Sequence, residues 1–352
     1  MSEPVYVPVL PVRQHARMAY ERLLPDIQAA VAPLWNLPPS PGVTPAELER
    51  AHWQKELRRV RGAHRRHPGW IDAPFAEAAQ TAALAAILAE HTELSRLLRP
   101  VTGPERSEAQ QTAAVETARC CGCGVGVRVR MPGEWDGATA QAVGGLLARI
   151  GREVPVDLLL DLGSVLPGRP DAGKEALRAL DAVVVLANWR TVAVLGGAFP
   201  HVTDDMLRLG EPHEEPRADW NMWHEIRAGR RGDLSRLRYG DYGVQPPAAL
   251  AAEPGGGGPP WGVLRYTTDR LFVLCKILNA GSHRTASIRV AAGRIHDLPD
   301  FRGASASAGE TWLRDCADGP MTDGEGSGNH TQWLWAGNVQ HMTYVVRSLP
   351  GG

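Results

Sequence analysis

Apolar and polar residues alternate through residues 1–247 in two kinds of segment, short apolar runs and longer runs with helical spacing. Val156–Leu162 is almost continuously apolar, which is typical of a parallel strand covered on both faces. Val125–Arg130 ends in alternating apolar and basic residues, the period of a strand. The pattern predicts eight strands, at Val5–Leu10, Ala30–Leu37, Gly69–Phe75, Arg99–Thr102, Val125–Arg130, Val156–Leu162, Thr191–Phe199 and Leu237–Val244.

Most of these strands are followed by a segment with helical spacing. Thr44 and Ser107 each precede a Glu or Gln by three positions, the spacing of a capping box, so a helix is expected near each. The helix after Thr44 is expected to continue to about Arg66, and another is expected over Ala78–Leu98. Eight strand–helix repeats predict an α/β fold, a (β/α)8 TIM-like barrel. An open doubly wound sheet is the alternative, but no GxGxxG follows the first strand.

The alternation stops at residues 248–260, where four glycines between prolines predict a Gly/Pro-rich, flexible connector. Residues 261–352 beyond it are predicted to form a C-terminal α+β extension that packs on the barrel of residues 1–247. The elements expected in the extension are paired strands at Gly262–Tyr266 and Leu271–Lys276, a helix near Ala308–Ala317, a Gly-rich loop at Gly319–Asn329 and a last strand at Met342–Val346.

Basic and acidic residues balance, with 38 Lys+Arg against 39 Asp+Glu and a formal net charge of −1. This balance argues against a general nucleic-acid or membrane-surface binder, which usually carries net positive charge. Only Lys55, Lys174 and Lys276 are lysines, so nearly all basic residues are arginines. Arginine is suited to forked hydrogen bonds with carboxylate or phosphate, so the positions of the arginines become informative.

Nothing in the chain indicates a membrane span or a signal peptide, because it has no long apolar window and no basic segment before an apolar run near its start. Three of the five cysteines lie in Cys120–Cys123. A single CxxC without a second pair is a weak zinc signal, so reduced thiols in a cytoplasmic protein are the interpretation.

Barrel enzymes carry their active sites at the carboxyl ends of the strands. Arg128 and Arg130 lie two apart on one strand and therefore share a face, while Asp161 closes an apolar run. The candidate ligand-binding residues near strand ends are Arg13, Arg128, Arg130, Tyr242, Arg265 and Tyr266. The candidate catalytic residues are Asp72, Asp161, Asp241 and His341.

These residues together predict a site for an anionic ligand, with phosphate as the favoured group, held by arginine forks. One aspartate would act as general base, and another would orient an arginine or bind a metal ion. No metal motif occurs, so the cofactor stays unknown, with a divalent metal ion as the candidate. Structural roles compete with these assignments, namely a buried ion pair for Asp161, a helix cap for Asp72 and a turn for Asp241.

Several segments spread along the chain resemble the "beta family" of proteins, named after a bacteriophage beta protein. They are Tyr6–Leu10, Pro33-Leu34-Trp35, Asp161-Leu162-Gly163, Arg217 with Trp220, Gly240-Asp241-Tyr242 and Gly337–Val346. The sequence departs from the family pattern at Gln340-His341, where the family has two histidines, and at Gln14 and His15, where it has an acidic residue. The resemblance implies occurrence in bacteria and phages, in some cases near defence genes, and no defined reaction.

Three functions remain open from the sequence. The first is a barrel enzyme or enzyme-like protein, in the manner of a hydrolase or phosphodiesterase, that binds an anionic small molecule. The second is a non-catalytic scaffold in a phage-conflict or defence system, with a protein partner on the C-terminal extension. The third and weakest is a nucleic-acid-associated factor, for which Arg58–Arg66 is the only local basic candidate.

Overall fold

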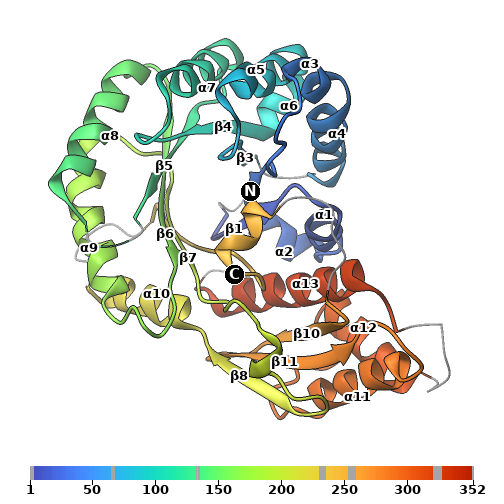
Figure 1. Ribbon diagram of the computed structural model, residues 1–352. Helices are drawn as coiled ribbons and strands as arrows, with labels where there is room; N and C mark the ends of the chain where they lie inside the picture. Colours follow the sequence, from blue (N-terminus) through green and yellow to red (C-terminus); the bar gives the residue numbers. More distant parts are fainter. Residues whose placement is uncertain are drawn as a thin grey trace.

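The computed structural model describes residues 4–64, 68–131, 133, 135–229, 235–252, 259–319 and 327–350. Eight parallel strands close into a barrel in the order β1-β2-β3-β4-β5-β6-β7-β9, with helices around its outside (Figure 1), so the predicted (β/α)8 fold is confirmed. The barrel strands are β1 (Tyr6–Pro11), β2 (Leu34–Asn36), β3 (Gly69–Asp72), β4 (Leu98–Thr102), β5 (Val125–Arg130), β6 (Val156–Ser164), β7 (Val192–Gly197) and β9 (Leu237–Asp241).

Five strands, β1, β4, β5, β6 and β7, lie within two residues of their predicted bounds. β3 and β9 each end three residues before the predicted Phe75 and Val244, and β2 is much shorter than the predicted Ala30–Leu37. Val31 makes only an isolated bridge to Tyr6, and the ladder with β1 begins after Pro33. Proline has no amide hydrogen to donate, so it marks the position where continuous pairing starts.

Helices cover the outside of the barrel, and both predicted capping boxes are present, at Thr44 with Glu47 and at Ser107 with Gln110. The single helix predicted over Ala78–Leu98 is wrong, because His91 leaves the helical conformation and divides it. The helices of this part are α1 (Gln14–Glu21), α2 (Pro25–Ala29), α3 (Pro45–Glu47), α4 (Trp53–Ala63), α5 (Thr81–Glu90), α6 (Thr92–Leu97), α7 (Glu108–Cys121), α8 (Gly137–Ile150), α9 (Ala172–Val183) and α10 (Ala218–Gly229).

A π-helical segment, η1 (Leu48–His52), joins α3 to α4, so the helix expected after Thr44 is not a uniform α-helix. The end predicted near Arg66 lies outside the described residues, as do parts of the connector and of the Gly-rich loop. The described part of the connector includes a short 3-10 helix, η5 (Pro247–Ala251).

A small lobe is built on a three-stranded sheet beside the barrel (Figure 1). β10 (Trp261–Thr267) and β11 (Leu271–Leu278) pair antiparallel as predicted. The third strand, β8 (Pro212–Pro216), comes from the segment between β7 and α10 and was not predicted, because its sequence PHEEP shows no apolar alternation. Helices α11 (Arg284–His296) and α12 (Ala308–Asp318) pack on one face of the sheet.

The last helix, α13 (His330–Ser348), replaces the strand predicted at Met342–Val346, and that prediction is wrong. The helix is buried on nearly all sides, because it packs between α1 and the lobe, where it contacts β10 and α12. Such a helix lacks the polar stripe that would identify it in the sequence. The domain division at residues 247 and 260 stays a prediction. Two elements connect the predicted parts, because β8 precedes residue 247 but pairs in the lobe sheet, and α13 follows residue 260 but packs on α1 of the barrel.

The barrel interior is filled in layers by the inward-facing residues of the strands. At the amino ends of the strands, Asp157 is fully buried and accepts hydrogen bonds from Trp70, Arg99 and Arg190. Above it lies an apolar layer that includes Val7, Val9, Leu34, Val101, Leu159 and Leu195. The barrel is therefore closed below, and its carboxyl-end layer is the part where polar side chains meet the mouth.

Candidate functional site

The carboxyl-end layer of the barrel is a ring of polar side chains. Asn36, Asp72, Arg128 and Asp161 each stand two residues after an inward-facing residue on their own strand, so each also faces inward. Tyr242 follows β9 directly and completes the ring. The structure thus brings together four predicted site residues, and it adds Asn36, which the strand-end rule could have found.

The guanidinium of Arg128 lies at the centre of the ring and is 1% exposed. Its Nε and Nη2 lie 2.9 and 2.7 Å from Asp161 Oδ2, and its Nη1 lies 2.7 Å from Asn36 Oδ1 and 2.8 Å from Asp72 Oδ2. Nη2 also donates to Tyr242 Oη at 3.0 Å. Arginine has five N–H donors, so these contacts leave Arg128 none for a ligand.

Arg128 and Asp161 are both ionised in this arrangement. Burial alone would lower the pKa of Arg128, but Asp161, Tyr242 and Asp72 raise it well above its ordinary value. Burial would likewise raise the pKa of Asp161, but Arg128 and the hydrogen bond from Tyr242 hold it below its ordinary value. Desolvation and the negative charge of Asp161 raise the pKa of Tyr242, so the phenol stays protonated.

Asp161 is held from all sides. Its Oδ1 accepts from Tyr242 Oη at 2.6 Å and from the Gly163 amide at 2.9 Å, while Oδ2 accepts twice from Arg128. Gly163 has a φ of +65°, a left-handed conformation that other residues rarely adopt. Each oxygen of Asp161 thus accepts two hydrogen bonds, which uses all four acceptor sites of the carboxylate. Asp161 therefore has no free lone pair to accept a substrate proton or bind a metal ion.

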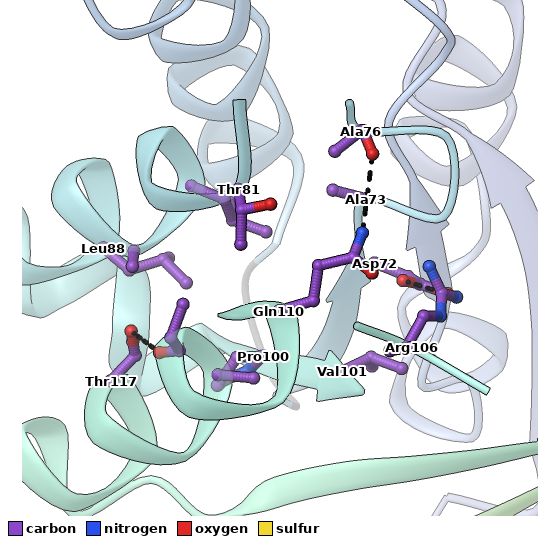
Figure 2. A pocket seen from close by; sticks show the side chains of 14 residues that line it. Asp72, Ala73, Ala76, Thr81, Leu88, Pro100, Val101, Arg106, Gln110 and Thr117 are labelled. Atoms are coloured by element: carbon purple, nitrogen blue, oxygen red, sulfur yellow. Dashed lines mark hydrogen bonds and ion pairs between the residues drawn. The ribbon is translucent and has the colours of Figure 1, made fainter. Parts of the chain in front are cut away.

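Asp72 is shared between two arginines, Arg128 and Arg106, and Arg106 Nη2 lies 3.2 and 3.1 Å from its two oxygens. Arg106 is in the turn after β4 and was not predicted. A small cavity of about 40 Å³ lies behind Asp72, between α5 and α7, and its lining is largely apolar. Figure 2 shows the side chains that line it, among them Asp72, Arg106 and Gln110. A space of this size holds water molecules rather than a metabolite.

A larger cavity of about 350 Å³ opens at the barrel mouth. Its polar lining is Arg128, Arg130, Asp161 and Tyr242, and its remaining walls include Phe75, Met131, Gly163 and η5. Arg130 is exposed and makes no hydrogen bond or ion pair with any residue that the structure describes. Arg128, Asp161 and Tyr242 are therefore bonded to one another at the bottom of the mouth cavity, and Arg130 is the cationic side chain in its lining without such a partner among the described residues.

Asp241 and His341 do not reach the mouth, because they lie on the outer face of the barrel wall, where β9 meets α13. Asp241 Oδ1 accepts from Tyr6 Oη at 2.5 Å, and Oδ2 lies 2.8 Å from His341 Nε2. His341 Nδ1 lies 2.9 Å from Thr267 Oγ1 on β10. Burial would raise the pKa of Asp241, but His341 and Tyr6 hold it below its ordinary value.

The order Thr267–His341–Asp241 is that of a nucleophile triad, yet all three side chains are buried, at 0%, 0% and 1% exposed. A substrate has no access to such a group. The chain of hydrogen bonds instead connects β9, α13 and β10, so it fixes the lobe against the barrel.

Asp219, a residue that the sequence did not single out, lies in the same outer-face region at the start of α10. Its Oδ2 accepts from Tyr239 Oη at 3.0 Å, and its Oδ1 accepts from the Trp220 amide at 2.8 Å. Burial raises the pKa of Asp219 to about 6, against the attraction of Arg217. Asp219 is thus the buried carboxyl group that titrates closest to neutral pH among the shifted groups described.

The remaining predicted ligand residues lie apart from the mouth cavity. Arg13 donates to the Ala252 carbonyl oxygen and holds the connector. Arg265 lies over the Phe199 ring, 5.4 Å from its centroid, and burial lowers the pKa of Arg265 to about 10. Tyr266 packs on the opposite face of the sheet, against Phe301.

No group of three or more His, Cys, Asp or Glu side chains that could hold a metal ion occurs among the described residues. The divalent metal ion considered from the sequence therefore stays a prediction. None of the helices in the described part of the chain is long and apolar enough to cross a membrane.

The closed parallel barrel, its polar carboxyl-end layer and the added three-stranded lobe define a TIM-barrel protein with an extension. A model of the Beta protein family matches residues 6–347, and the chain belongs to that family. Among solved structures, it is similar to a putative fructose-1,6-biphosphate aldolase from Coccidioides immitis, with 11% identity, a TM-score of 0.34, and coverage of 67% of this chain and 73% of that one. The comparison with curated proteins finds no match.

Proposed function

We propose that the barrel binds a small anionic ligand, with a phosphate or carboxylate group, in the mouth cavity. The observation that carries the proposal is Arg130, an exposed arginine that lines a cavity of about 350 Å³ and has no partner among the described residues. Ligand pockets of barrel proteins lie at this end of the strands.

The charge of the site favours an anion. Asp72 and Asp161 balance Arg106 and Arg128 in formal charge. Glu105 also pairs with Arg106, at 3.0 Å, but it does not line the cavity, whereas Arg130 lines it and has no carboxylate partner among the described residues. The cavity has apolar walls, and a charged hydrogen bond is stronger where water is partly excluded.

In this proposal Arg128 and Asp161 act as positioning residues. They hold the floor of the cavity rigid, and Tyr242 presents its hydroxyl from that floor. Although its position at a strand end predicted it, Arg128 does not bind the ligand directly, because its donors are already bonded within the protein. The proposal therefore concerns binding, and a hydrolytic reaction is left out of it.

Isothermal titration calorimetry on the full chain tests the proposal, with inorganic phosphate, phenyl phosphate and succinate as probes. Arg130→Ala is expected to weaken binding of the best probe by about tenfold or more, since it removes a charged hydrogen bond. Arg152→Ala is the matched control, an exposed arginine at the amino end of β6. If no probe binds, or if Arg130→Ala binds as tightly as the control, the proposal is wrong.

A further inference from the structure

A second and larger cavity, of about 960 Å³, lies beside the carboxyl ends of β1 and β2. One wall comes from the barrel, through Val12 and Arg13 after β1 and Leu37 and Pro38 after β2. The other wall is residues 50–59 of η1 and α4. We call this cavity the α4 cleft, and it shares no lining residue with the mouth cavity.

The lining of the α4 cleft is strongly basic, although the whole chain is nearly neutral. It contains one carboxylate, Glu56, and five cationic side chains, Arg13, Arg50, Lys55, Arg58 and Arg59. Glu56 is already engaged, at 2.5 Å from Arg59 and 3.5 Å from Arg17. Arg50, Lys55 and Arg58 are exposed and make no ion pair with the described residues.

Such a surplus of one charge is unfavourable within the protein itself. Lys55 lies three residues before Arg58 and four before Arg59, so their side chains are neighbours on α4, and like charges at these spacings destabilise a helix. Arg50 stands in the π-helical turn η1, a conformation frequently found at functional sites. A bound anion would relieve the repulsion, and a cleft of one charge concentrates anions.

We propose that the α4 cleft binds a small ligand that carries two or more phosphate groups. Cations on both walls, Arg13 on one side and Arg50 and Arg58 on the other, suit several anionic groups rather than one. The cleft also has the volume for such a ligand. Single-stranded nucleic acid fits less well, because bases need an exposed aromatic platform, and the one Trp in the lining, Trp53, is 3% exposed.

The test is isothermal titration calorimetry of the full chain with inorganic triphosphate, at about 50 and about 200 mM salt. Arg50→Ala and Arg58→Ala change exposed side chains and are therefore expected to leave the fold intact. Each is expected to weaken binding by about tenfold or more, and raising the salt is expected to weaken it further. Both changes are made in the Arg130→Ala background, so that the mouth cavity does not contribute to the measurement. Arg152→Ala in the same background is the control and is expected to bind triphosphate as the Arg130→Ala protein does.

Four results would overturn the proposal. Triphosphate does not bind, or it binds the Arg50→Ala and Arg58→Ala variants as tightly as the control variant. Orthophosphate binds the Arg130→Ala protein as tightly as triphosphate does, which would mean that the cleft is a site for a single anion. A labelled single-stranded oligonucleotide binds more tightly than triphosphate and is lost in Arg58→Ala, which would assign the cleft to nucleic acid. Loss of triphosphate binding in Arg130→Ala alone would place the ligand in the mouth cavity instead.

Discussion

Replacing Arg128 by methionine tests the ionic layer at the barrel mouth. Methionine fills the space of the arginine stem but offers no donor, so all five hydrogen bonds of the guanidinium are lost. Asp72 keeps Arg106, whereas Asp161 keeps only Tyr242 and the Gly163 amide. Asp161 thus becomes a buried carboxylate without a counter-ion.

Removing one partner of a buried ion pair costs about 3–5 kcal/mol, because the remaining charge stays buried. We expect Arg128→Met to lower the free energy of unfolding by that amount at pH 7. Arg130→Met is the matched control on the same strand, and it is expected to change stability by less than about 0.5 kcal/mol because Arg130 is exposed. Urea unfolding followed by tryptophan fluorescence measures both.

The pH dependence of the stability of Arg128→Met provides an independent test of the same account. In the unchanged protein the pKa of Asp161 is lowered by folding, so its stabilisation is present above the unfolded value and is lost only as the pH falls below it. Without Arg128, burial raises the pKa of Asp161, and stability is lost as the pH rises through the raised value. The deficit of Arg128→Met is therefore expected to be smaller at pH 5 than at pH 7.

Adding Asp161→Asn to Arg128→Met removes the stranded charge and is expected to restore at least half of the lost stability. A result in which Arg128→Met lowers the free energy of unfolding by less than about 1 kcal/mol at pH 7, or by the same amount at pH 5 and pH 7, would refute this reasoning.

Three further predictions concern other buried groups. Thr267→Val removes the partner of His341 Nδ1 and is expected to cost about 1–3 kcal/mol in urea unfolding, since the imidazole is left buried and unsatisfied; no loss would contradict its role in fixing the lobe. Gly163→Ala is expected to cost about 1–2 kcal/mol through its positive φ, whereas Gly145→Ala, in the open on α8, should be neutral or stabilising. The raised pKa of Asp219 gives a stabilisation that is present below about pH 4 and lost as the pH rises through about 6, and Asp219→Asn is expected to remove it. The free energy of unfolding measured as a function of pH tests this, and an unchanged profile would contradict the raised pKa.

The barrel was predictable from the sequence because its information is local. The strand pattern in Val125–Arg130 and the capping boxes at Thr44 and Ser107 depend on near neighbours, and the structure contains all of them. The last helix was not predictable, because α13 is buried on nearly all sides and its buried residues include the polar Asn338, Gln340 and His341, so no polar stripe reveals the helical period. β8 was missed because its pairing with β11 depends on a partner far along the chain.

In the candidate site, too, local sequence patterns predicted some features and long-range contacts decided the others. The sequence by itself determined that Arg128 and Arg130 share one face of a strand, because side chains alternate along a strand, and that Asp72 and Asp161 lie on two other strands. Only the tertiary structure decided that Arg128 has no free donor, since its partners come from four other strands or strand ends.

Asp241 shows the same limit at the level of one residue. It also lies at a strand end, but the alternation of β9 turns Asp241 outward to α13 and leaves Tyr242 at the mouth. Which face of a strand lines the interior depends on the closure of the barrel and on the helices outside it. Those contacts join residues far apart in the chain, and no local pattern encodes them.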